Sequence, residues 1–127
     1  MKWMDRERSF WVIGGDLRQR ALARLLREDG HTVHIAGLEG EGLEPEPLGP
    51  GLALAHCVIL PLPVAVGESF VHTPLSAARL PLAQVLDCLR PGQLVCGGMI
   101  SPAVAAEMTR RGLRWADYYA REECMVA

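Results

Sequence analysis

A strand, a helix and a second strand follow one another between residues 10 and 36, and this unit constrains the fold more than any other part of the chain. A short apolar run at 10–13 ends in two glycines, which is typical of a buried strand and a tight turn. Asp16 then suits the N-cap of a helix, and Gly30 suits its C-terminal stop. A second strand is expected at 31–36. Because such a unit joins parallel strands, the sequence predicts a parallel sheet.

The apolar residues of this first helix repeat at a helical spacing. We expect them to form the face buried on the sheet, with four arginines falling mostly on the other side. The residues expected on the buried face are Leu17, Ala21, Leu22, Leu25 and Leu26. The arginines are Arg18, Arg20, Arg24 and Arg27.

The rest of the chain continues the same alternation. Strands are expected at 57–60, 94–96 and 113–119, and helices at 82–89 and 101–111. Segments 37–54 and 62–80 are predicted to be loops, because glycine and proline interrupt them. The sequence therefore predicts an α/β fold in one domain over 1–127. It would be a flavodoxin-like or Rossmann-like, three-layer, doubly wound parallel sheet, with about five strands in the order 2-1-3-4-5.

The composition excludes several classes of function. The chain has 127 residues, with 13 Lys plus Arg against 15 Asp plus Glu, whereas nucleic-acid binding needs a basic excess. No apolar stretch approaches the roughly 20 residues of a membrane span, and residues 1–10 do not resemble a signal peptide. The four cysteines show no CxxC spacing, so we expect reduced thiols in a cytoplasmic protein.

The four histidines show no metal-ligating pattern. His31 and His34 lie three apart on an expected strand, so their side chains point to opposite faces. His56 and His72 have no cysteine or carboxylate at ligand spacing. No P-loop, serine-nucleophile or zinc-protease motif is present. We therefore expect no metal site, and the sequence identifies no catalytic residue.

Open parallel sheets bind ligands at the carboxyl ends of their strands, near the point where the strand order reverses. The first such place is the turn from Gly14 to Gln19. Gly14 can be the first glycine of a dinucleotide fingerprint, but Asp16 stands at the second glycine and Gln19 at the third. Three interpretations stay open: NAD(P) binding, a tight turn with a helix cap, or a small-ligand site that Arg18 and Gln19 face. An arginine near a helix N-terminus suits a carboxylate.

Two further places at the carboxyl ends carry unusual residues. Pro61 and Pro63 follow the expected third strand, and they either rigidify a loop beside the ligand or simply end the strand. Gly97 and Gly98 follow the fourth strand, where they either let the backbone approach a ligand or form a permissive turn.

Four segments resemble, in order, the family of the dipicolinate synthase A subunit. Residues 12–19, VIGGDLRQ, are similar to the family's opening VIGGDxRQ and are the most specific of the four. Residues 58–63, VILPLP, resemble its ILPxP segment, and residues 95–98, VCGG, match its fourth strand and glycine turn. Residues 119–127, YAREECMVA, resemble the segment before the family's linker, although Cys124 stands where the family often has an acid.

The resemblance implies an enzyme that oxidises dihydrodipicolinate to dipicolinate, with NADP as the hydride acceptor. It implies a partner, the flavoprotein-like B subunit of dipicolinate synthase, in the cytoplasm of the mother cell of a sporulating bacterium, and it leaves a homodimer open. A second domain of that family carries a GxGxxG unit and binds the cofactor. We expect that domain to be absent here, so that this chain is the N-terminal, substrate-side domain and is inactive alone.

The resemblance also implies the residues on the substrate side of a cleft between the two domains. Arg18 is assigned to a substrate carboxylate, and Asp16 to a cap that orients the loop. No general base is identified, because a capping carboxylate has a low pKa and is a poor base. The implied substrate-binding residues are Gly14, Gly15, Asp16, Arg18, Gln19, Pro61, Pro63, Gly97 and Gly98.

Two alternatives to a catalytic domain stay open. One is a stand-alone regulatory module that binds an adenine nucleotide or coenzyme A at the turn after the first strand. The other is a subunit-interaction domain that uses the apolar loop 62–80 and Trp115 as its contact surface.

Overall fold

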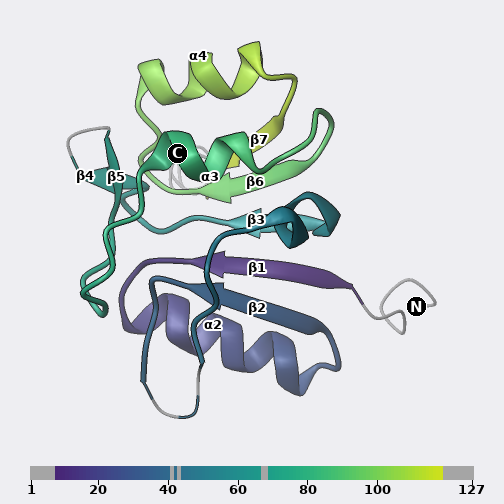
Figure 1. Cartoon of the computed structure of the whole chain (residues 1–127), viewed down its shortest axis with the longest axis vertical. Helices are drawn as coiled ribbons and strands as arrows, with labels where there is room; N and C mark the ends of the chain where they lie inside the picture. The colour runs from purple at the N-terminus through teal and green to yellow at the C-terminus, as the bar shows by residue number, and fades with distance from the viewer. Residues whose placement is uncertain (1–7, 41, 43, 67–68, 119–127) are drawn as a thin grey trace, which may run out of the picture.

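A computed structural model describes residues 8–40, 42, 44–66 and 69–118. Its central sheet has five parallel strands in the order β2-β1-β3-β6-β7 (Figure 1). These strands are β1 (Ser9–Ile13), β2 (Thr32–Ala36), β3 (Cys57–Ile59), β6 (Leu94–Gly97) and β7 (Arg114–Asp117). Numbered within this sheet alone, the order is 2-1-3-4-5. The predicted α/β doubly wound sheet is therefore confirmed.

The helices lie on both faces of the sheet, as the three-layer prediction requires. They are α2 (Leu17–Glu28), α3 (Leu82–Asp87) and α4 (Pro102–Arg110). On one face Ala23 of α2 packs with Val12 and Ile35. On the other face α3 and α4 pack over Val58 and Val95 in a larger core (Figure 1). None of the helices described here is long and apolar enough to cross a membrane.

The helix α2 has the predicted caps, but its predicted buried face is only partly correct: Leu22 and Leu26 are partly buried, and Leu26 packs against the core. Asp16 accepts a hydrogen bond from the backbone N–H of Arg18, and Gly30 follows the helix with a φ of +92°. The buried residues are Gln19 and Ala23, whereas Leu17 and Leu25 are 60% and 57% exposed. The helix therefore rests on the sheet through Ala23, the amide of Gln19 and the partly buried Leu26, while Leu17 and Leu25 are left outside.

The two predicted loops contain short elements that the sequence did not reveal. A 3₁₀ turn, η1 (Pro50–Leu54), lies in the first, and its Leu52 is fully buried. In the second, β4 (Ala65–Val66) and β5 (Phe70–Val71) form an antiparallel hairpin. Val64 and Val71 of this segment are buried in the larger core, so part of its apolar surface serves folding and is not an exposed contact surface.

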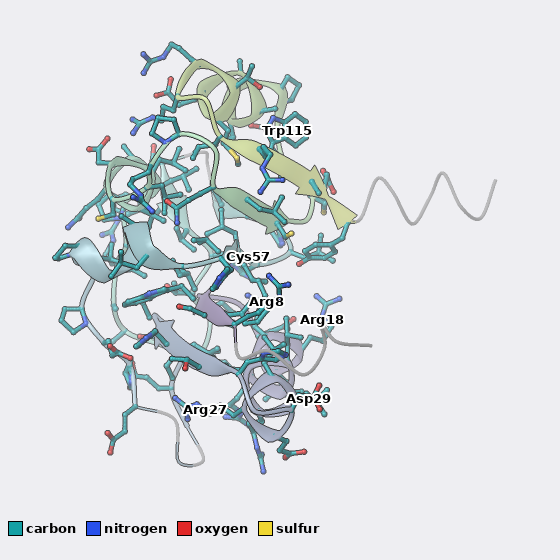
Figure 2. The ribbon with its side chains drawn as sticks, turned by 90° about the vertical axis from the view of Figure 1, so that its right-hand side faces the viewer. Arg8, Arg18, Arg27, Asp29, Cys57 and Trp115 are labelled. Atoms are coloured by element: carbon teal, nitrogen blue, oxygen red, sulfur yellow. The ribbon has the colours of Figure 1, made fainter. Side chains whose placement is uncertain are left out.

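Trp115 lies at one edge of the sheet, on its last strand. Trp115 lies on β7, at the opposite edge of the sheet from α2 (Figure 2). Its indole N–H donates to Thr109 Oγ1 of α4 at 3.1 Å, and the side chain is 38% exposed. Trp115 therefore packs against its own neighbouring helix. The segment 119–127, with Cys124, lies outside the described residues.

Candidate functional site

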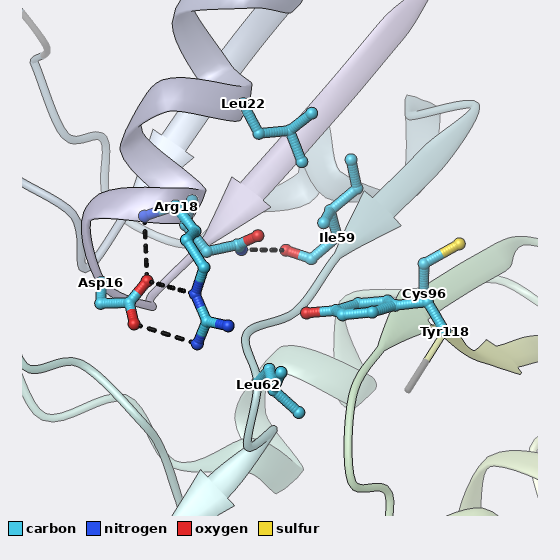
Figure 3. Close-up of a pocket in the computed structure, with 8 residues that line it drawn as sticks. Asp16, Arg18, Leu22, Ile59, Leu62, Cys96 and Tyr118 are labelled. Atoms are coloured by element: carbon cyan, nitrogen blue, oxygen red, sulfur yellow. Dashed lines mark hydrogen bonds and ion pairs between the residues drawn. The ribbon is translucent and has the colours of Figure 1, made fainter. Parts of the chain in front are cut away.

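A pocket of about 340 Å³ opens at the carboxyl ends of β3 and β6, beside the N-terminus of α2 (Figure 3). The strand order reverses between β1 and β3, so the pocket lies where open α/β sheets bind their ligands. It is lined by Asp16, Arg18, Gln19, Leu22, Ile59, Leu62, Cys96 and Tyr118. An apolar wall with a few polar groups is the usual make-up of a small-molecule site.

The charged side of the pocket is an ion pair at the start of α2. Arg18 Nε donates to Asp16 Oδ1 at 3.3 Å, and Arg18 Nη2 donates to Asp16 Oδ2 at 3.1 Å. This hydrogen bonding holds the pKa of Asp16 below its usual value and raises the pKa of Arg18. Figure 3 shows the remaining nitrogen, Nη1, turned toward the middle of the pocket. The pair therefore presents one edge of the guanidinium to a ligand.

The amide of Gln19 connects α2 to the sheet behind that ion pair. Its side chain is 6% exposed, and Nε2 donates to the carbonyl of Ile59 at 3.4 Å. Gly15 lies directly against it, because a Cβ at Gly15 would overlap the Gln19 side chain and come within 3.2 Å of Pro61 Cβ. Gly15, Gln19 and Pro61 are therefore one packed unit that supports the pocket wall.

The turn after β1 is occupied by the protein's own backbone. The N–H of Gly14 donates to the carbonyl of Ala36, and the N–H of Gly15 donates to the carbonyl of His72, both at 2.8 Å. A Cβ at Gly14 would lie 2.7 Å from that His72 oxygen. A dinucleotide pyrophosphate needs such amides and an approach free of carboxylates. With Asp16 also at the helix N-terminus, these residues do not fit the phosphates of NADP or of another nucleotide.

The glycine pair after β6 does not line the pocket but packs against the residues that form its wall. A Cβ at Gly97 would lie 2.5 Å from Val64 Cγ2, and one at Gly98 would overlap the side chain of Leu62. The N–H of Gly98 donates to the carbonyl of Pro61 at 3.2 Å. The pair therefore lets the loop after β3 cross the end of β6 and place Leu62 in the pocket. The peptide bond between Leu62 and Pro63 is cis.

The far wall of the pocket is Tyr118, directly after β7. The preceding residue, Asp117, accepts hydrogen bonds from the backbone N–H groups of Met99 at 3.3 Å and Ile100 at 2.9 Å. These bonds tie the end of β7 to the loop after β6. Figure 3 shows the Tyr118 hydroxyl pointing into the pocket, toward the side that carries Arg18. Partial burial raises the pKa of this phenol.

The structure places only part of the predicted site residues at the pocket. Asp16, Arg18 and Gln19 line the pocket, whereas Gly15, Pro61, Gly97 and Gly98 pack behind its walls. Gly14 packs against the loop after β5, and neither Gly14 nor Pro63 lines the pocket. Five lining residues were missed from the sequence: Leu22, Ile59, Leu62, Cys96 and Tyr118. Strand alternation could have found two of them, because paired residues at the ends of β3 and β6 share a face.

Cys96, which lines the pocket, contacts a second thiol. The sulfurs of Cys57 on β3 and Cys96 on β6 are 3.7 Å apart. The hydrogen bond with Cys96, together with burial, strongly raises the pKa of Cys57. Cys57 is therefore a protonated packing residue at neutral pH. Among the described residues, no group of three or more potential ligands is placed to hold a metal ion.

Comparison of the sequence with models of known protein families shows which family the chain belongs to. The model of the N-terminal domain of the dipicolinate synthase A subunit matches residues 9–119. The chain belongs to this family. A search of curated proteins found no match.

Solved structures of the dipicolinate synthase A subunit have the same fold as this family member. The Bacillus subtilis protein superposes with a TM-score of 0.73 at 20% identity, over 88% of this chain and 40% of its own. The Bacillus halodurans protein gives 0.72 at 15% identity, over 87% of this chain and 40% of its own. The chain thus spans well under half the length of these relatives.

Proposed function

We propose that this chain is the substrate-side domain of an NADP-dependent enzyme that oxidises dihydrodipicolinate to dipicolinate. The chain belongs to the family of the N-terminal domain of the dipicolinate synthase A subunit, and one observation in its structure supports this proposal. The guanidinium of Arg18 is presented at the mouth of an apolar pocket, at the point where the strand order reverses. A planar dicarboxylate combines the carboxylate and the apolar ring that such a pocket suits.

In this proposal the domain binds and orients the substrate. Arg18 takes a carboxylate through Nη1, and Asp16 holds the guanidinium in that orientation. Ile59 and Leu62 receive the ring and exclude water from it. Asp16 is not the general base, because its lowered pKa makes it a weak proton acceptor.

The remaining parts of the reaction are assigned elsewhere. NADP, the hydride acceptor, is expected on the part of the longer protein that this chain does not span, because the turn after β1 does not fit its phosphates. Alone, the domain is expected to be inactive. The flavoprotein-like B subunit is the expected partner, in the cytoplasm of the mother cell of a sporulating bacterium. The proposal needs no metal, nucleic acid or membrane and leaves a homodimer open.

The proposal is tested by titrating the ¹⁵N-labelled chain with dipicolinate and following backbone amide shifts by NMR. We expect shifts at residues 14–19 and at Tyr118. Arg18→Ala should weaken binding at least tenfold, since a hydrogen bond to a charged group contributes about 1.5–3 kcal/mol. Arg110→Ala, on α4, is the matched control and should bind normally. Absence of shifts at millimolar dipicolinate, or full binding by Arg18→Ala, would refute the proposal.

A further inference from the structure

The pocket has a hydrogen-bond donor on each of two facing walls. Arg18 Nη1 is turned inward from α2, and the Tyr118 hydroxyl is turned inward from the end of β7 (Figure 3). The two groups are close enough for the charge of Arg18 to act on the phenol. The side chains of Ile59 and Leu62 flank the space between them (Figure 3). A ligand that fits this order has an anionic group at each end and an apolar middle.

The backbone directly before Tyr118 is held by contacts outside the pocket. Asp117 anchors the end of β7 through two backbone amides of the loop after β6. One of these belongs to Met99, which has a φ of +55°. A non-glycine residue adopts this conformation when its surroundings hold it there. The backbone that leads into Tyr118 is therefore held in place before any ligand arrives, which reduces the entropy lost on binding.

We propose that Tyr118 is a substrate-contacting residue that receives the second carboxylate of a planar ring dicarboxylate while Arg18 receives the first. This inference rests on the proposed function and adds a specificity determinant to it. Tyr118 then distinguishes a dicarboxylate from the corresponding monocarboxylate. The cavity of about 340 Å³ lies at the small end of the roughly 300–1,000 Å³ range of ligand sites, which suits a single ring.

The test compares two ligands on three forms of the chain. Dipicolinate and picolinate share the ring and one carboxylate, and they differ only in the second carboxylate. Their affinities are measured by NMR titration for the wild type, Tyr118→Phe and Arg18→Ala. The wild type should prefer dipicolinate by about tenfold, as expected for one hydrogen bond to a charged group. Tyr118→Phe keeps the ring and loses the hydroxyl, so it should bind both ligands equally, with picolinate affinity unchanged.

The pH dependence of binding distinguishes a direct contact from a structural role. The groups facing the phenol are Arg18 from α2, Asp16 from its N-cap, Cys96 from β6 and Asp117 from β7. Because partial burial keeps the phenol protonated above its ordinary range, the preference for dipicolinate should persist at pH 9 and fall at higher pH. Tyr118→Phe should show no preference at any of these pH values.

Each outcome separates this inference from the proposed function. If Tyr118→Phe retains the tenfold preference while Arg18→Ala loses binding, the role of Tyr118 is refuted and the proposed function stands. If the wild type binds neither ligand at millimolar concentration, both are refuted. Thermal melts of the variants show whether they are folded. If Tyr118→Phe is not folded, the preference of the wild type is followed as the pH is raised until ultraviolet absorbance shows that the tyrosines are ionised, and a preference unchanged at that point refutes the contact.

Discussion

Asp16 caps the helix that carries Arg18 and also holds the Arg18 side chain. One carboxylate oxygen accepts the backbone N–H of Arg18 at 2.9 Å and its Nε at 3.3 Å, while the other accepts Nη2 at 3.1 Å. The guanidinium is thus oriented by the residue that fixes the start of α2. Asp16 stands where a dinucleotide fingerprint has glycine. At this helix N-terminus it therefore orients a cationic side chain, at a place where the fingerprint would bind a phosphate.

Separating the two tasks of Asp16 gives the first prediction. Asp16→Asn can still cap α2 but loses the ion pair, so stability should change by less than about 0.5 kcal/mol while dipicolinate affinity falls severalfold. Asp16→Ala should also lose about 1 kcal/mol of stability. Urea unfolding and NMR titration measure the two effects. Ser101→Ala, which removes the cap of α4, should cost similar stability and leave affinity intact. Unchanged affinity in Asp16→Asn would contradict the orienting role.

The crowded turn after β1 predicts a large difference between two glycine substitutions. Gly14→Ala puts a Cβ 2.7 Å from the His72 oxygen at a φ of +67°, whereas Gly30→Ala, at +92°, meets nothing within 4 Å. Gly30→Ala should cost about 1–2 kcal/mol from the backbone conformation alone. Gly14→Ala should cost about 2 kcal/mol more, because packed backbone must move. Equal costs in urea unfolding would show that the loop after β5 does not pack on this turn.

The ion pairs of α4 predict how stability depends on pH. Arg110, and then Arg111, lower the pKa of Glu107 from 4.5 to about 2. A lowered pKa in the folded state stabilises the protein above the unfolded value, and this contribution disappears as the pH falls from 4.5 toward 2. Glu107→Gln should therefore lower the urea midpoint at pH 6 and not at pH 2. A difference that stays constant down to pH 2 would contradict this prediction.

The thiol pair predicts unequal alkylation rates. Because the pKa of Cys57 is raised, its reactive thiolate is scarce, so Cys57 should react more slowly with iodoacetamide at pH 8 than the half-buried Cys88. Mass spectrometry of peptides measures each rate. Cys96→Ala removes the hydrogen bond, so Cys57 should react faster than in the native chain. Because burial still raises the pKa of Cys57, it should remain slower than Cys88. Reaction of Cys57 as fast as that of Cys88 in the native chain would contradict the prediction.

The sequence predicted the elements that carry a repeated local signal. The strand at β1, the cap at Asp16 and the Ser101–Pro102 helix start are all found in the structure. The hairpin of β4 and β5 was missed, because strands of two residues are too short to show alternation. The buried face of α2 was predicted only in part, because apolar spacing shows where the leucines gather and not which of them meet the sheet.

For the site, the sequence predicted the turn and not the pocket. Arg18 and Gln19 could be found because they follow a strand directly, at the edge where ligands bind. Leu62 and Tyr118 could not, because their contribution depends on how the loop after β3 crosses Gly98 and on how Asp117 ties β7 to a neighbouring loop.

The sequence by itself determined the parallel sheet, the strand order and the cap that presents Arg18. The cap follows from interactions between neighbours in the chain, while the sheet and its order follow from the alternation of strands and helices and from the handedness of their connections. Only the tertiary structure decided that the turn after β1 is closed to phosphates and that Tyr118 faces Arg18. Both depend on residues far apart in the chain, His72 against Gly15 and Tyr118 against Arg18. Such contacts are set by packing, which no local pattern specifies.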